Sequence, residues 1–83
     1  MKAETYHQLK RGIAELLGCA PSTITPESTF DELGADSIDM LELEMTIETG
    51  FSIVVPDYSL TKSKTVREVA KIIDELTETE DGE

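Results

Sequence analysis

Apolar residues recur at spacings of three and four near both ends of the chain, which predicts an amphipathic helix in each place. The first helix is expected from about Glu4 to Leu17, with Gly18 as its end. The last helix follows the capping box Thr65–Glu68 and is expected to end near Leu76. The apolar positions are Tyr6, Leu9, Ile13, Leu16 and Leu17 in the first helix, and Val66, Val69, Ala70, Ile73 and Leu76 in the last.

A third helix is predicted in the middle of the chain, and it has two apolar stripes. Asp36 is a good N-cap residue, so the helix is expected to begin at Ser37. It is expected to end at Thr49, with Gly50 as a left-handed C-cap. At 100° per residue the apolar side chains fall on two separate faces. We assign Met40, Leu43 and Ile47 to the core, and Ile38, Leu41 and Met45 to a surface patch that meets partners.

The segments between the helices are predicted to be ordered. Residues 19–35 contain Pro21 and Pro26 and show no sustained period, which indicates a long loop. Ile24, Phe30 and Leu33 are spaced through this loop as apolar anchors, which favours an ordered structure. Residues 51–55 are mostly apolar, but no second strand is predicted to pair with them, so they are expected to cover the helix ends.

These elements predict an all-α fold. Asp57 can cap a short helix over residues 58–61, and a polar link at 62–64 then leads to the last helix. We therefore expect a small four-helix bundle, with three main helices plus one short helix and a long ordered loop between helices 1 and 2. The helical domain is expected to span residues 1–76, and residues 77–83, which are polar and acidic, to form a flexible tail.

Composition narrows the choice of function. The 83 residues form one small domain, and the net charge of −11 repels nucleic acid and anionic membranes and favours partners with a basic docking face. The single cysteine, Cys19, allows neither an internal disulfide nor a cysteine-built metal site, and is expected to be at least half-buried. With neither a signal peptide nor a membrane-spanning stretch, a cytoplasmic monomer is expected.

Ser37 is the most informative single residue. Its hydroxyl lies in the first turn of a helix, where an attached phosphate is favoured by roughly 0.3–1 kcal/mol. Nucleophilic catalysis is disfavoured, because the only histidine, His7, lies on the first helix and is expected to be a solvated surface residue. The acidic residues have no calcium-loop spacing, so no specific metal site is expected. From these residues alone, Ser37 is either an ordinary helix opener or a point of attachment.

Several segments together resemble an acyl carrier protein. They are residues 34–39 (Gly-Ala-Asp-Ser-Ile-Asp), 30–33 (Phe-Asp-Glu-Leu), 51–53 with Pro56 and Asp57, and Thr65–Val66. The resemblance spans nearly the whole chain. It implies a non-catalytic carrier, to whose Ser37, preceded by Asp36, a phosphopantetheinyl transferase joins 4′-phosphopantetheine from coenzyme A with Mg²⁺. The terminal thiol of that arm then carries acyl groups as thioesters.

The same resemblance implies two further sets of residues. Partner enzymes with basic docking faces are expected to bind Ile38, Asp39, Leu41, Glu42, Met45 and Glu48. An acyl chain buried between the helices is expected to contact Met40, Leu43, Ile47, Phe51 and Ile73. Each buried methylene would contribute roughly 0.8 kcal/mol, less the cost of opening the core.

Some positions depart from the family pattern and leave the pathway open. Glu44 stands where many members have an apolar residue, and Lys62 and Lys64 add local positive charge. A carrier for general fatty acid synthesis and one for a specialised lipid or polyketide-type product both fit. The alternatives are a peptidyl or aminoacyl carrier, whose usual Gly-Gly-Asp/His-Ser setting fits less well, and an unmodified acidic helical adaptor.

Overall fold

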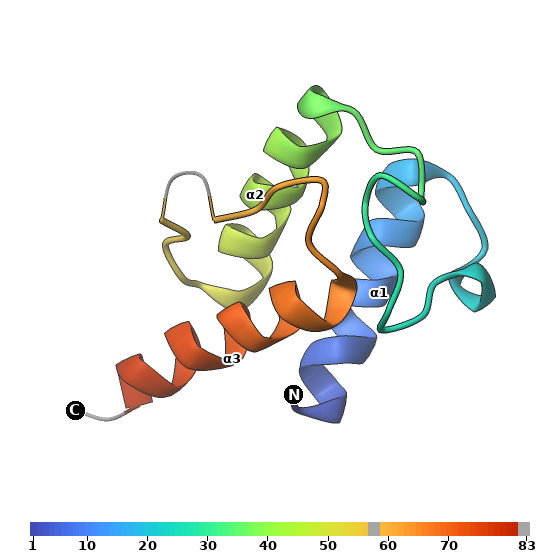
Figure 1. Ribbon diagram of the computed structural model, residues 1–83. Coiled ribbons are helices and arrows are strands. Elements are labelled where there is room, and N and C mark those ends of the chain that lie inside the picture. The colour runs from blue at the N-terminus through green and yellow to red at the C-terminus, as the bar shows by residue number, and fades with distance from the viewer. Residues whose placement is uncertain (57–58, 82–83) are drawn as a thin grey trace.

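The computed structural model describes residues 1–56 and 59–81, and its regular structure is entirely helical. It contains three α-helices, α1 (Ala3–Leu17), α2 (Ser37–Phe51) and α3 (Val66–Asp81), and one short 3₁₀ turn, η1 (Pro21–Thr23) (Figure 1). No strand occurs in these two described ranges; the one sheet-like contact is an isolated antiparallel bridge between Thr29 and Thr65. The all-α class is confirmed.

The predicted short fourth helix is not seen among the described residues. Residues 57 and 58 lie outside the described ranges, and residues 59–61 are not helical. The Ser59 N–H donates to the Pro56 carbonyl oxygen at 3.2 Å. The additional helical segment is η1, in the first loop, where Pro21 occupies the first helical position. The structure therefore has three main helices with one 3₁₀ turn.

Two helix ends differ from the prediction. Helix α2 continues through Gly50 to Phe51, and Ser52 takes the left-handed conformation (φ 57°) that was assigned to Gly50. The half-buried Phe51 ring packs against the core, which favours the additional residues of helix. Helix α3 continues past Leu76 to Asp81, since residues 77–81 contain neither glycine nor proline to end it. The flexibility of residues 77–83 stays a prediction.

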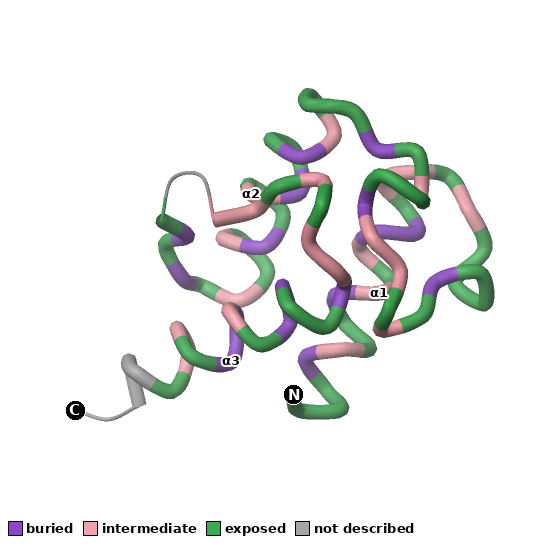
Figure 2. The backbone as a smooth tube through the Cα atoms, in the orientation of Figure 1, coloured by how far each residue is buried: buried purple, intermediate pink, exposed green. Residues whose placement is uncertain are grey.

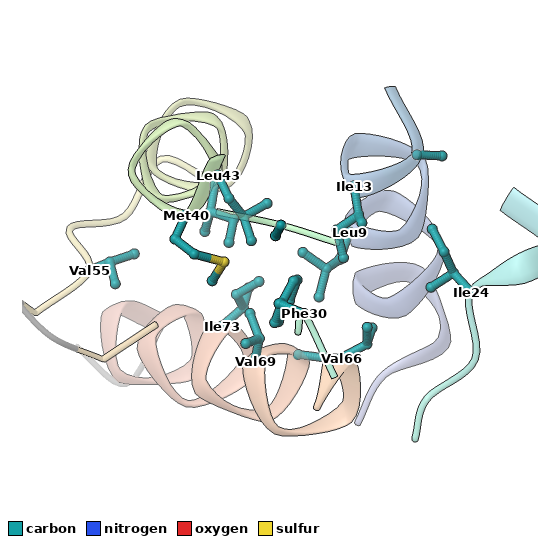
Figure 3. Close-up of a cluster of buried hydrophobic side chains, with 14 of the residues drawn as sticks. Leu9, Ile13, Ile24, Phe30, Met40, Leu43, Val55, Val66, Val69 and Ile73 are labelled. Carbon is teal, nitrogen blue, oxygen red and sulfur yellow. The ribbon is translucent and has the colours of Figure 1, made fainter. Parts of the chain in front are cut away.

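The core lies where α1 packs against both α2 and α3. Figure 3 shows Met40 and Leu43 of α2 pointing toward Ile73 of α3 and the ring of Phe30, with Leu9 of α1 on the opposite side. The predicted stripes of α1 and α3 supply six of the fifteen buried apolar residues of the described chain, and the core stripe of α2, which adds three more, is confirmed. The residues added by the connecting segments are Ile24, Phe30, Ala35, Ile53 and Val55.

The long loop between α1 and α2 is ordered because backbone hydrogen bonds join it to the segment before α3 and to the first turn of α3. The Asp31 N–H donates to the Lys62 carbonyl oxygen at 2.9 Å, and the N–H groups of Val66 and Arg67 donate to the carbonyl oxygens of Ser28 and Pro26. Phe30 anchors the loop, with 1% of its surface exposed. In Figure 1 this loop wraps past α1 and delivers the chain to the first turn of α2. Its order therefore fixes the position of Ser37.

Candidate functional site

Ser37 is the first residue of α2, and the loop before it holds it at the surface. The Ala35 N–H donates to the Phe30 carbonyl oxygen at 3.0 Å, so the last loop residues are tied to a buried aromatic anchor. Gly34, which lies between Phe30 and Ala35 in the sequence, turns the chain with φ 86°, a conformation that other residues rarely adopt. Ala35 is buried, whereas Asp36 and Ser37 are exposed. Figure 2 shows that the chain is exposed where it enters α2. The Ser37 hydroxyl is therefore accessible to another molecule.

The first turn of α2 is closed by a reciprocal capping box. The Asp36 carboxylate accepts the Asp39 N–H at 2.8 Å, and the Asp39 carboxylate accepts the Asp36 N–H at 3.1 Å. The N-cap role of Asp36 is confirmed. Asp39, which was expected only to meet partners, has a structural role that its spacing of three residues from Asp36 could have indicated.

Among residues 1–56 and 59–81, the capping box leaves two backbone N–H groups unpaired next to the Ser37 hydroxyl. In the described part of the chain, no carbonyl or side chain accepts from the N–H groups of Ser37 and Ile38. These groups lie at the positive end of the α2 dipole, where a phosphate is stabilised. The residues present therefore fit a phosphate ester on Ser37.

No catalytic base accompanies Ser37 in the described residues. His7 is exposed on α1, with its ring centroid 5.7 Å from that of Tyr6, and no interaction joins it to Ser37 there. Among the side chains described, those of residues 1–56 and 59–78, no group of three or more His, Cys, Asp or Glu could hold a metal ion. What this site presents is an accessible hydroxyl without a base to activate it.

The second stripe of α2 faces solvent, as predicted. Ile38, Leu41 and Met45 are 67%, 58% and 54% exposed, which is unusual for large apolar side chains on one short helix. Glu42 is exposed beside them. Glu48 differs, because it is half-buried and its carboxylate accepts the Val55 N–H at 2.9 Å. It therefore holds the segment after α2 in place.

A groove opens beside Ser37, between α2 and residues 60–62. Its walls are formed by Ser37, Met40, Leu41, Glu44, Leu60, Thr61 and Lys62, and it holds about 630 Å³, partly open to solvent. Of these wall residues, the acyl-chain prediction included only Met40. The departures at Glu44 and Lys62 were visible in the sequence, but their placement in one groove depends on how the loop before α3 packs.

The other residues predicted to contact an acyl chain lie elsewhere. Leu43, Ile47 and Phe51 line a second groove, of about 310 Å³, between α1 and α2. Ile73 is buried in the core, with 1% of its surface exposed. The structure thus places the five predicted residues in two grooves and the core, and only Met40 lies next to Ser37.

An exposed serine at a helix start, a phosphate-compatible first turn and an exposed apolar stripe together fit a carrier protein. A family model described as "Phosphopantetheine attachment site" matches residues 7–73, a span that contains Ser37 and all of α2. The acyl carrier protein of Zymomonas mobilis subsp. mobilis is 38% identical over 74 residues, which cover 88% of this chain and 95% of that protein. The chain therefore belongs to the phosphopantetheine-attachment family and is an acyl carrier protein homologue. None of the helices described is long and apolar enough to cross a bilayer.

Proposed function

We propose that Ser37 carries 4′-phosphopantetheine and that the protein presents acyl groups as thioesters on this arm. The observation that carries the proposal is the exposed Ser37 hydroxyl beside the unpaired N–H groups of Ser37 and Ile38. Asp36 and Asp39 stabilise the helix start, and their carboxylates are already hydrogen-bonded to the backbone. The chain supplies the position of the arm and no catalytic group.

Attachment transfers a phosphoryl group from the pyrophosphate of coenzyme A to Ser37, and this chain supplies only the nucleophilic oxygen. The Ser37 oxygen forms a bond to the phosphorus of coenzyme A that bears the pantetheine. The pyrophosphate P–O bond breaks, the serine proton passes to a base of the transferase or to water, and adenosine 3′,5′-bisphosphate leaves. Once bound, the group supplies a thiol that forms and exchanges thioesters.

The exposed stripe is proposed as the surface that binds partner enzymes. Ile38, Leu41 and Met45 supply apolar contacts, while the carboxylates near them favour a basic partner face. The net charge of −11 speeds such encounters and makes them sensitive to salt. Asp39, Glu42 and Glu48 belong to this proposed surface, although Asp39 and Glu48 also hold the backbone.

The remaining parts of the proposal concern cargo and setting. A long acyl chain would pass Met40 and separate the core side chains to reach Leu43, Ile47, Phe51 or Ile73. Fatty acid, specialised lipid and polyketide-type synthesis are the pathways in which such a carrier serves. We propose a cytoplasmic monomer with a flexible end at 77–83.

Intact mass measures the proposed attachment directly. The unmodified protein is incubated with coenzyme A, Mg²⁺ and a broad-specificity phosphopantetheinyl transferase, and its mass is compared before and after. We expect a gain of one phosphopantetheine in the parent protein and none in Ser37→Ala. Ser22→Ala is the matched control, since Ser22 is also exposed in a helical turn and should leave the gain intact.

The same experiment distinguishes a phosphopantetheine carrier from an unmodified acidic adaptor protein. A folded parent protein that gains no mass would refute attachment and leave an unmodified acidic protein that binds through its exposed stripe. A gain that persists in Ser37→Ala would show that another residue takes the arm. Incubating the loaded form with acyl and aminoacyl donors and their ligases then distinguishes an acyl carrier from an aminoacyl carrier.

A further inference from the structure

The groove beside Ser37 is lined by both apolar and charged side chains. Met40, Leu41 and Leu60 supply the apolar surface, and Met40 is only 7% exposed. Glu44 and Lys62, both half-buried, supply one negative and one positive charge. Figure 1 shows the chain before α3 crossing beside α2, the crossing that forms this groove.

The two charged side chains that line this groove are available to a ligand. Within residues 1–56 and 59–78, no ion pair or side-chain hydrogen bond involves the Lys62 ammonium or the Glu44 carboxylate. The backbone of Lys62 is fixed, because its carbonyl oxygen accepts the Asp31 N–H at 2.9 Å. Lys62 is therefore a cation held on the same groove as the attachment serine, in a protein with only seven basic residues against 18 acidic ones.

A cation near Ser37 would further stabilise a phosphodiester there. Asp36 and Asp39 flank the serine, and a further negative charge there meets their repulsion, which the helix dipole offsets only in part. Among the seven basic residues, Arg67 pairs with Glu27 and Lys10 lies over the Tyr6 ring. The basic residue that shares a groove with Ser37 is Lys62.

The rest of the groove matches the first half of the arm. From Ser37 to Glu44 the helix rises roughly 10 Å, at 1.5 Å per residue. The arm begins with a phosphodiester, continues with a branched dimethyl group and then presents a hydroxyl and an amide. The groove offers a cation, apolar side chains, and the polar side chains of Glu44 and Thr61, which are the kinds of group that these three parts of the arm would contact.

We infer that Lys62 is the counterion of the phosphodiester on Ser37 and that the groove holds the dimethyl half of the arm. This inference rests on the proposed function. An acyl chain is a poorer occupant of this groove, because its methylenes would remove water from the charged groups of Glu44 and Lys62 without giving them hydrogen bonds. The amide and hydroxyl of the arm give them those bonds.

The test uses nuclear Overhauser effects in protein loaded on Ser37, with loading confirmed by mass. We expect contacts from the dimethyl protons of the arm to the methyl groups of Met40 and Leu60 in the loaded parent protein. In Lys62→Gln these intensities should fall by a factor of about three, the size expected for one partly exposed ion pair. Lys64→Gln is the matched control, since Lys64 is also half-buried but does not line the groove.

The salt concentration provides a second test. High salt should weaken the contacts in the parent protein and in Lys64→Gln, but should add little to the loss in Lys62→Gln, because the screened charge pair is already absent there. The ³¹P shift of the loaded protein should respond to Lys62→Gln and not to Lys64→Gln.

Three results would overturn the inference. Loaded parent protein without these contacts would show an arm that stays in solvent, and equal contacts in Lys62→Gln would remove the role of the lysine. Contacts from an attached acyl chain in place of the dimethyl group would assign the groove to the cargo. A parent protein that gains no mass would refute the proposed function itself, which the mass measurement registers separately.

Discussion

The reciprocal hydrogen bonds between Asp36 and Asp39 stabilise the first turn of α2, so Asp36→Ala is expected to destabilise the protein. The substitution removes the carboxylate that accepts the Asp39 N–H at 2.8 Å and leaves that N–H without an intrahelical acceptor. Loss of an N-cap side chain costs about 1 kcal/mol, within a range of 0.5–2. In a domain of 83 residues this corresponds to a fall in melting temperature of roughly 4–8 °C.

The same substitution also removes a negative charge, which acts in the opposite direction. The protein has a net charge of −11, so each carboxylate removed lowers self-repulsion and favours the folded state. Glu42→Ala is the matched control: Glu42 is exposed on the same helix and, in the described structure, forms no side-chain hydrogen bond. The difference in unfolding free energy between the two variants therefore isolates the cap.

Urea unfolding of both variants, with the slope m held in common, measures this difference. Asp36→Asn should recover most of the loss, because asparagine caps helices about as well as aspartate. Equal stabilities of Asp36→Ala and Glu42→Ala would refute the reasoning. A failure of Asp36→Asn to recover stability would show that charge, and not the hydrogen bond, is responsible.

Two other predictions concern the buried carboxylate of Asp74 and the exposed stripe of α2, which consists of Ile38, Leu41 and Met45. Asp74→Ala should cost about 2–3 kcal/mol, because the buried carboxylate accepts from the Thr5 hydroxyl at 2.6 Å and from the Lys2 N–H at 2.8 Å. Thermal unfolding measures this loss of stability. The control is Glu78→Ala, an equal charge change on the exposed side of α3, which should cost less than about 0.5 kcal/mol. Similar losses of stability in the two variants would contradict the reasoning. Met45→Ser should leave stability within about 0.5 kcal/mol but lower kcat/KM of the transferase at least about fivefold. An equal loss in Val54→Ser, which removes an exposed apolar side chain outside α2, would show that the stripe has no special role.

The features that depend on short-range pattern could be read from the sequence. The spacing of apolar residues predicted α1, α2 and α3, and the wheel of α2 correctly separated the buried Met40 from the exposed Leu41 and Met45. The cap at Asp36 and the capping box before α3 were also predictable, because each involves residues three apart. These interactions form within one turn of helix and need no knowledge of the rest of the fold.

The features that depend on distant segments could not be read in the same way. The left-handed residue after α2 is Ser52 and not Gly50, because the packing of Phe51 against the core extends the helix beyond its strongest stop signal. The groove next to Ser37 exists because the loop after α1 fixes the chain before α3 through the Asp31–Lys62 backbone hydrogen bond. Neither residue of that bond has a sequence pattern that points to the other.

Leu41 belongs to both proposed surfaces, and this links them physically. It is one of the three residues of the exposed stripe of α2, and it also lines the groove beside Ser37, together with Met40 and Glu44. A partner that covers Leu41 removes water from one side of the groove, and charge interactions strengthen where water is excluded. Docking should therefore change how firmly Lys62 holds the phosphodiester. Met45, which lies on the stripe but not on this groove, can bind the same partner without touching the arm.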